Sequence, residues 1–392
     1  MTKEENMFAK IAQRTLLITI ILIFVFGLVI LNNVESAERI KFRIPEISGY
    51  TTLKCDFHMH TVFSDGNVWP TIRAKEIWNH GLDAFSITDH IEYQPHKDDI
   101  SKNHNRPYEI AKPTADSLNL ILIKGTEITR SMPPGHFNAI FLNDINPLDT
   151  EKWEDSIKSA FDQGAFIFWN HPPFPQPEGK CVWYPEHEDI YKKGWLHGIE
   201  VVNGTSYYPE AHKWCLEKKL TMIGNSDIHD PMDLEYDINN SQMRPMTLVF
   251  VKEKTPEAIK EALFARRTVV YSQNMLIGEE EYLKPIFDAS IEVCNPQVTI
   301  KGDGSARLEI YNKSDIPLDL VANGELPEIS FPNDIKISAG KSILISVKSK
   351  SKELSGEKEI NIPYKVKNML VAPNEGLSAT IKVKIKFIPK EE

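Results

Sequence analysis

The chain has 392 residues, a hydrophobic fraction of 41% and a charged fraction of 26%, which are typical of a globular protein and exclude a disordered one. Its net charge of −10 argues against long nucleic-acid polymers as partners, because a phosphate backbone requires a basic surface. The four cysteines are widely spread without a Cys-x-x-Cys, so they predict neither a zinc ribbon nor a dense disulfide framework. The length allows two domains and a leader.

The chain begins with a basic segment followed by an apolar one. Lys3, Lys10 and Arg14 precede residues 16–31, which are almost wholly apolar. This order is typical of an export signal. The run is long for a cleaved signal and slightly short for a spanning helix, which needs about 20 residues. We therefore predict that residues 1–37 are either a cleaved signal peptide or a membrane anchor, and the sequence does not choose between the two. The protein is then expected to be periplasmic or otherwise extracytoplasmic.

Strand-like and helix-like segments alternate over residues 44–286. Helices are predicted at Thr71–Asn79, around Trp153–Phe161 and from Thr255 to Ala265, where Thr255 would cap the helix and Pro256 would open it. This alternation predicts an α/β barrel or an open parallel sheet. The strand candidates are short apolar runs, as expected of strands buried on both faces: Thr52–Phe57, Ala84–Thr88, Leu118–Lys124, Phe137–Leu142, Ala165–Trp169, Gly198–Val202, Leu220–Ile223 and Thr247–Val251.

Histidines and carboxylates gather next to these strands, at the rim where (β/α) barrels carry their active sites. His58 and His60 leave the first strand on one face, since side chains alternate along a strand. The Asp65-Gly66 turn can bring a carboxylate back toward them. The other residues of this kind are His90, Glu127, His136, His171, Asp227 and His229. Imidazoles with a few carboxylates suit Zn²⁺, Mn²⁺ or Fe²⁺, so we predict a metal site.

The same residues resemble the PHP (polymerase and histidinol phosphatase) family over residues 53–271. The matching pieces are His58-Met59-His60 with Asp65, Thr88-Asp89-His90, Gly125-Thr126-Glu127, His136, Asn170-His171-Pro172 and Asp227-Ile228-His229. The resemblance implies a distorted (β/α)7 barrel with a trinuclear centre. It implies one ion held by His58, His60, Glu127 and Asp227, a second shared through Glu127 with His136 and His171, and a third held by Asp65, His90 and His229.

The leader and a following β-domain further resemble a subgroup of extracytoplasmic PHP phosphodiesterases that act on small organophosphate diesters. Three divalent ions against three carboxylates would leave a charge of roughly +3, which suits a phosphate ester. A hydroxide held by the ions would attack phosphorus in line. We expect Asp89 to orient a ligand. The alternatives are a phosphomonoesterase like histidinol phosphatase, and a non-catalytic metal-binding scaffold.

Long loops around the predicted rim are expected to set specificity. They are Pro172–Glu186, Gly204–Pro209 and Asp230–Pro245. Arg130 is the first candidate for gripping a phosphate oxygen and Arg244 the second, with a surface ion pair as the alternative for Arg130. The expected aromatic walls are Trp169, Phe174, Trp183, Tyr184, Tyr207 and Tyr208.

The sequence pattern changes at about residue 287. Short alternating segments separated by turns rich in Gly, Pro, Asn and Asp predict an immunoglobulin-like β-sandwich over residues 287–392. It carries no candidate ligand, so we expect it to support or place the barrel. Its strand candidates are Ser290–Val293, Ala306–Tyr311, Ile335–Ile337, Ser342–Val347, Glu359–Tyr364 and Ala379–Phe387.

Overall fold

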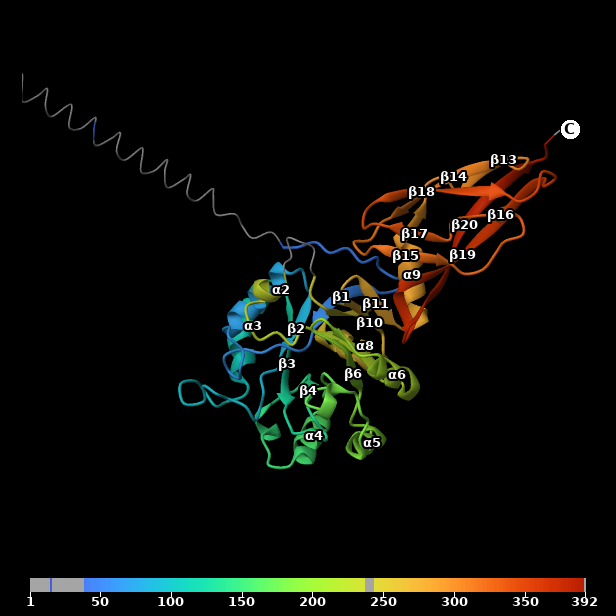
Figure 1. The fold of residues 1–392 in the computed structure, drawn as a ribbon. Helices are drawn as coiled ribbons and strands as arrows, with labels where there is room; N and C mark the ends of the chain where they lie inside the picture. Colours follow the sequence, from blue (N-terminus) through green and yellow to red (C-terminus); the bar gives the residue numbers. More distant parts are fainter. Residues whose placement is uncertain (1–14, 16–38, 237–242, 391–392) are drawn as a thin grey trace, which may run out of the picture. The chain divides into compact units, whose positions relative to one another are not determined.

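The structure is a computed structural model, and it describes Thr15, residues 39–236 and residues 243–390 (Figure 1). The predicted leader lies outside the described residues apart from Thr15. No helix among the described residues is long and apolar enough to cross a membrane. The contacts divide the chain into residues 1–40 and residues 41–392, and every described strand lies in the second unit.

The first strands form one half of a barrel. β1 (Thr51–Asp56) pairs in parallel with β2 (Ala84–Ile87), and β2 pairs in parallel with β3 (Ile121–Ile128). β4 (Phe137–Ile140) runs antiparallel to both β3 and β5 (Phe166–Trp169). The start of β4 therefore lies at the same rim as the carboxyl ends of its neighbours.

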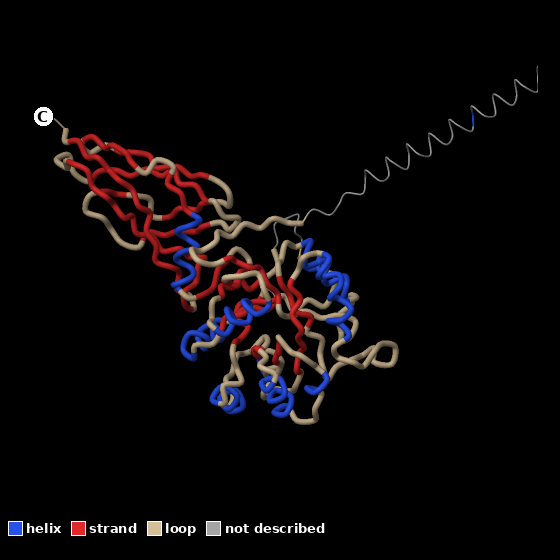
Figure 2. The backbone as a smooth tube through the Cα atoms, turned by 180° about the vertical axis from the view of Figure 1, so that it is seen from behind, coloured by secondary structure: helices blue, strands red, loops and turns tan. Residues whose placement is uncertain are grey.

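The other half of the barrel returns to β1. β6 (Gly198–Asn203) pairs in parallel with β5 and with β8 (Thr221–Asn225). A parallel bridge between Met59, after β1, and Ile228, after β8, closes the ring. The helices lie outside these strands, as Figure 2 shows in blue around red. They are α2 (Pro70–Asn79), α3 (Arg106–Ser117), α4 (Trp153–Asp162), α5 (Pro185–Lys192), α6 (Pro209–Lys218) and α8 (Pro256–Phe264).

The predicted start of α8 agrees with its cap geometry. Thr255 Oγ1 accepts a hydrogen bond from the backbone N–H of Ala258 at 3.1 Å, and Pro256 occupies the first turn, where it has no N–H to leave unpaired. The predicted long loops are partly ordered into short elements. These are the 3₁₀ turn η2 (Pro177–Gly179), β7 (Ser206–Tyr207) and α7 (Met232–Glu235), while residues 237–242 lie outside the described part.

A meander connects the barrel to the C-terminal strands. β9 (Met246–Val251) pairs antiparallel with β1 and with β10 (Thr268–Ser272), and β10 pairs with β11 (Met275–Gly278). Helix α9 (Glu280–Ser290) follows. The predicted boundary between residues 286 and 287 falls inside this helix.

The C-terminal strands form two sheets. One has the order β12-β14-β18-β16, and the other contains β13, β20, β19, β15 and β17. β11 pairs in parallel with β19, so the second sheet continues into the barrel, and barrel and sandwich residues share one apolar cluster. The bounds are β12 (Ile291–Val293), β13 (Gln297–Lys301), β14 (Ser305–Asn312), β15 (Leu318–Ala322), β16 (Ile329–Ser330), β17 (Asp334–Ile337), β18 (Ser342–Ser349), β19 (Gly356–Ala372) and β20 (Glu375–Ile388).

Candidate metal centre

All nine residues proposed as ligands lie at one rim of the barrel. Eight of them lie at or beyond the carboxyl ends of their strands, where a barrel of this type presents side chains. His136 is different, because it precedes β4. Since β4 runs antiparallel, the residue just before its start lies at the same rim.

The His58 group consists of His58, Glu127, His171 and Asp227. His58 Nε2 lies 3.0 Å from Glu127 Oε2 and 3.0 Å from Asp227 Oδ1. His171 Nε2 lies 3.8 Å from both Glu127 Oε1 and Asp227 Oδ2. The donor atoms of His58, Glu127 and His171 lie within 4.8 Å of one another, as do those of His58, His60 and Asp227. Such spacing allows one ion to touch several donors.

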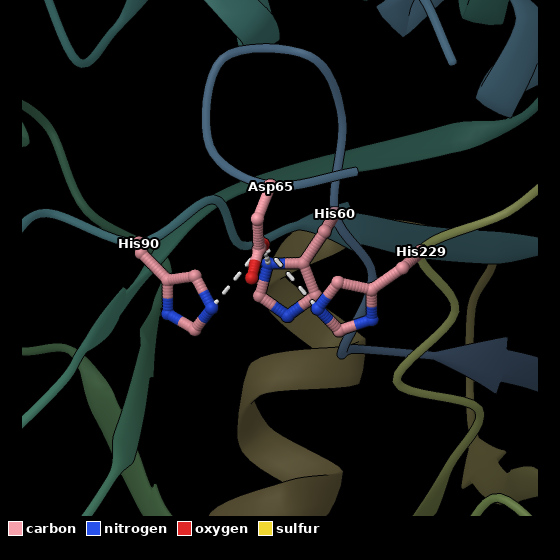
Figure 3. A group of neighbouring side chains, drawn as sticks. All are labelled: His60, Asp65, His90 and His229. Carbon is pink, nitrogen blue, oxygen red and sulfur yellow. Dashed lines mark ion pairs between the residues drawn. The ribbon is translucent and has the colours of Figure 1, made fainter. Parts of the chain in front are cut away.

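The Asp65 group consists of His60, Asp65, His90 and His229 (Figure 3). Asp65 Oδ1 lies 3.4 Å from His90 Nε2 and 3.3 Å from His229 Nε2. The His60 ring stacks on both other imidazoles, with centroid distances of 4.4 Å to His90 and 4.2 Å to His229. The four donors lie within 4.8 Å of one another. His60 Nε2 also lies 3.0 Å from Asp227 Oδ1, which joins the two groups.

Buried donor atoms without hydrogen-bond partners mark this rim as a place for cations. Glu127 Oε1 and His136 Nδ1 face each other at 2.8 Å, yet neither makes a hydrogen bond of good geometry, and the same holds for Asp65 Oδ1. Leaving such atoms unpaired in the interior costs free energy. The residues therefore fit divalent ions, and the imidazole-carboxylate donor set suits Zn²⁺, Mn²⁺ or Fe²⁺.

The electrostatics of the His58 group favour the charged forms of both His58 and Glu127. Burial disfavours a charge on His58, but the carboxylates of Asp227, Glu200 and Glu127 outweigh it and raise the pKa of His58 well above its usual range. Burial likewise opposes the Glu127 charge, and the imidazoles of His90 and His58 nevertheless hold the pKa of Glu127 well below its usual range. The carboxylates of Glu127 and Asp227 are thus charged and attract either protons on the histidines or metal ions in their place.

The loop after β1 needs a glycine to return Asp65 to the rim. A Cβ on Gly66 would lie 2.6 Å from the carbonyl carbon of His60, so a larger residue would push the loop away. His171 and Asp227 adopt positive φ values of 26° and 55°. Non-glycine residues seldom adopt this conformation, and functional sites are where it concentrates.

Asp89 supports the Asp65 group from behind. Its carboxylate accepts hydrogen bonds from Thr61 N at 2.6 Å and from Ser64 Oγ at 2.7 Å. Ser64 Oγ in turn lies 3.3 Å from His60 Nδ1, which donates to it and so directs Nε2 toward the rim. This geometry supports the orienting role predicted for Asp89, and the role itself stays a prediction.

Sequence reasoning missed Arg73, which is fully buried in α2. Its guanidinium donates to the backbone carbonyls of His60 (2.8 Å), Ile228 (3.1 Å), His229 (2.7 Å) and Asp230 (2.8 Å). Arg73 therefore ties the strand end that carries His60 to the loop that carries His229. In sequence, Glu76 three residues on predicts only an ordinary ion pair along a helix, which Arg73 Nη1 does form at 2.8 Å, so no local signal placed Arg73 at the rim.

A cavity of about 460 Å³ opens over the rim. Its aromatic lining is Tyr93, Phe174 and Tyr208, and no lysine or arginine of the described residues lines it. The exposed fractions of Tyr93 and Phe174 are 53% and 60%, so both rings stand at the mouth. Of the six aromatic residues predicted to form walls, only Phe174 and Tyr208 do so in the part of the chain that the structure describes.

The prediction was wrong for the tryptophans because they pack behind the rim. Trp169 is fully buried and stacks on His187 and on Trp214, with centroid distances of 3.8 Å and 5.6 Å. Trp183 packs edge-on against Trp214 at 5.3 Å. Tyr184 and Tyr207 are also absent from the cavity lining among the described residues.

Neither arginine proposed to bind phosphate reaches the cavity. Arg130 Nε pairs with Glu92 at 2.8 Å, and its other nitrogens donate to the backbone carbonyls of Thr150 and Glu151. This is the ion-pair alternative, so the expected contact with substrate is not supported by the geometry. Arg244 is fully buried and forms an ion pair with Asp56 beneath the rim.

Comparison with solved structures identifies the family. A two-domain protein from Bacteroides vulgatus, described as containing a predicted PHP-like metal-dependent phosphoesterase, matches with 44% sequence identity and a TM-score of 0.83. The match covers 88% of this chain and 99% of that one. The chain belongs to the PHP family. The resemblance to the PHP family is thereby confirmed, and so is the fold class of an α/β barrel followed by an Ig-like sandwich.

Two further comparisons cover parts of this PHP protein. The model of DUF5001, an Ig-like domain, matches residues 291–382, within the predicted sandwich. An uncharacterised protein of Methanocaldococcus jannaschii is 37% identical over 84 residues, which is 21% of this chain. The match spans about a third of that relative, 36% of its length.

Proposed function

We propose that this PHP protein is a metal-dependent phosphodiesterase that hydrolyses small phosphodiesters. The observation that carries the proposal is the convergence of nine histidine and carboxylate side chains at one rim beneath a cavity whose described lining includes three aromatic rings and no lysine or arginine. The description of the Bacteroides vulgatus protein as a PHP-like metal-dependent phosphoesterase supports the coarser part, a metal-dependent phosphoric ester hydrolase.

We assign about three divalent ions to the rim, as zinc, manganese or iron. The His58 group with His60 and His136 would hold two of them, and Asp65, His90 and His229 would hold the third. When bound, such ions polarise phosphoryl oxygens and lower the pKa of water so that it becomes a nucleophile near neutral pH. Their positive charge complements the charge that a phosphoryl group develops during displacement.

The residues of the chain itself bind and orient the ester. Tyr93 and Phe174 stand at the cavity mouth and Tyr208 lies within it, so a substrate with an organic group can place that group against a ring. The cavity volume of about 460 Å³ suits a small ligand and not a polymer. His60 is held by the Ser64–Asp89 relay, and its backbone by Arg73, so that the donors are in place before substrate arrives.

The choice between a diester and a monoester follows from charge. A diester carries one negative charge and two organic arms, whereas a terminal monoester carries nearly two charges and calls for additional cationic side chains. The described lining offers aromatic rings and no lysine or arginine. The lining therefore supports the diester, and a histidinol-phosphatase-like monoesterase is the second candidate.

The test compares an aryl phosphodiester with the matching aryl phosphomonoester on metal-loaded protein. We expect the higher kcat/KM for the diester. A monoester preferred by tenfold or more would replace the proposal with the monoesterase. Turnover of neither ester by protein with bound ions would favour the non-catalytic scaffold.

We further propose that the enzyme works outside the cytoplasm, because a basic start precedes the apolar residues 16–31. Fusing residues 1–45 to a reporter that is active only after export tests this placement. A reporter without activity, next to an active fusion carrying a known export signal, would contradict it. Recovery of the mature fusion from the membrane or the soluble fraction distinguishes an anchor from a cleaved signal.

A further inference from the structure

Glu200 is a buried carboxylate in contact with three different segments of the rim. It lies in the middle of β6 between the apolar residues Ile199 and Val201, and its exposed fraction is 0%. An isolated buried carboxylate is costly, so such a residue persists only where its oxygens are paired. Here both oxygens are paired, and each accepts two hydrogen bonds.

The first oxygen of Glu200 fixes the ring of His58. Oε1 lies 2.8 Å from His58 Nδ1 and accepts from Asn225 Nδ2 at 2.9 Å. Because a carboxylate only accepts, His58 carries its proton on Nδ1 in this contact. Its other nitrogen, Nε2, points at Glu127 and Asp227 and is the one left to bind an ion, which displaces any proton there.

The second oxygen fixes the other members of the His58 group. Oε2 accepts from the backbone N–H of His171 at 2.8 Å, which stabilises the uncommon positive φ of that residue. It also accepts from Asn203 Nδ2 at 2.9 Å, and the same amide donates to Asp227 Oδ2 at 3.1 Å. Glu200 thus connects His58, His171 and Asp227, which come from three different segments.

We infer that Glu200 is the positioning residue of the His58 group: it selects the tautomer of His58 and sets His171 and Asp227 around the same point. It binds no substrate, since it does not line the cavity. Partners of this kind behind a metal ligand typically change metal affinity by about tenfold to a hundredfold when removed. The inference rests on the proposed function only in requiring that the rim binds ions.

The test is metal affinity, measured by equilibrium dialysis with Zn²⁺ and with Mn²⁺. Asp65→Asn removes a donor of the Asp65 group, so ions that remain in this variant report on the His58 group. Glu200→Gln is then added to the Asp65→Asn variant. It replaces one carboxylate oxygen, which accepts two hydrogen bonds, by an amide nitrogen that can only donate and therefore faces two donors. We expect the affinity of the remaining ions to fall by at least about tenfold. Glu200→Asp, which keeps both acceptors, should recover part of the loss.

The matched control is Thr221→Val. Thr221 is buried at the opposite end of the adjacent strand β8, and its hydroxyl donates to Leu263 O at 2.7 Å, so the change also removes a buried hydrogen bond at nearly constant volume. It should leave the affinity within about twofold. A Co²⁺ absorption spectrum altered by Glu200→Gln and unaltered by Thr221→Val would add a signature of changed ligand geometry.

Two results would overturn the inference. One is an affinity that Glu200→Gln changes by less than about twofold, and the other is an equal loss in Thr221→Val, which would indicate general destabilisation. If the wild-type protein binds no ion, the proposed function fails together with the inference. If it binds ions that Glu200→Gln does not weaken, only the inference fails.

Discussion

The barrel and the sandwich bury different kinds of side chain. Among the described residues, the barrel buries charged groups that include Asp56, Arg73, Glu127 and Glu200, while the only buried polar residues from 291 onward are Asn312, Ser314 and Ser349. All 12 histidines lie between residues 58 and 229. Buried charges cost free energy and persist where they form networks or hold cations. The contrast assigns the chemistry to the barrel rim and apolar stability to the sandwich.

The largest expected effect comes from breaking the rim at its shared carboxylate. Glu127 Oε2 lies 3.0 Å from His58 Nε2, and Oε1 lies 2.8 Å from His136 Nδ1, so its two oxygens reach side chains that we assign to two different proposed ions. Glu127→Gln removes the charge at nearly constant shape. We expect it to release more than one ion per chain. It should also lower kcat/KM by more than about a hundredfold, because a hundredfold is the upper end of the loss when a residue that only orients a ligand is removed. Elemental analysis and steady-state kinetics measure both.

Glu154→Gln is the control for this change, because Glu154 is exposed on α4. It should retain all ions and full activity. Retention of all ions in Glu127→Gln would show that Glu127 is not shared between ions.

A core substitution in the sandwich should lower stability and leave metal content and activity unchanged. Leu320 in β15 is fully buried in the apolar cluster that barrel and sandwich share. Leu320→Ala should lower the free energy of unfolding by about 2–5 kcal/mol, through lost burial and the cavity left behind. Metal content and kcat should stay unchanged in the folded protein at low temperature. A loss of ions while the variant is still folded would mean that the sandwich takes part in forming the rim.

The barrel should also show a pH dependence that the histidine-free sandwich lacks. His187 is fully buried, with Nε2 donating to Pro134 O at 2.7 Å and Nδ1 accepting from Tyr184 N at 3.0 Å. Burial lowers its pKa to about 4 from the usual 6.5. The unfolded chain therefore takes up a proton first, and the stability contributed by neutral His187 is complete above pH 6.5 and lost as the pH falls to about 4.

Denaturant unfolding of metal-free protein between pH 7 and pH 4 measures this effect. His187→Gln should have a lower free energy of unfolding than the wild type at pH 7. Between pH 7 and pH 4 the free energy of unfolding should fall less in the variant than in the wild type, by up to about 3 kcal/mol. His96→Gln, at an exposed position, should follow the wild-type curve. Parallel curves for the wild type and His187→Gln would show that His187 is not held neutral.

The smallest effect is expected at Arg130. Its guanidinium is engaged by Glu92 and by two backbone carbonyls, and it does not line the cavity. Arg130→Ala should therefore change kcat/KM for a diester by less than about threefold and lower stability by about 1 kcal/mol or less. A tenfold loss of kcat/KM with all ions retained would return Arg130 to the substrate site.

The sequence predicts which side chains meet at the rim better than it predicts the residues around them. The positions of the proposed ligands were readable because histidines beside short apolar strands are informative by type. The antiparallel direction of β4, which explains how His136 reaches the rim, was not readable from a short apolar run. Trp169 and Arg130 were misassigned because proximity in sequence to a ligand does not determine which way a side chain points.

Glu200 and Arg73 were missed for a related reason. Each contacts backbone or side-chain atoms that are distant in sequence. Glu200, for example, contacts His58, which lies 142 residues before it. The only local signal for Glu200 was a single carboxylate within an apolar strand. In the sandwich, the alternation of β18 was enough to predict a strand. The β19–β20 hairpin is longer than predicted, and β19 also pairs near its end with β11, which is distant in sequence.

Counting the bound ions decides whether the barrel rim holds one metal centre built from nine side chains. Purified protein loaded with Zn²⁺, Mn²⁺ or Fe²⁺ and freed of excess metal should contain about three ions per chain by elemental analysis. A content of at most one ion per chain would rule out a three-ion centre at the rim.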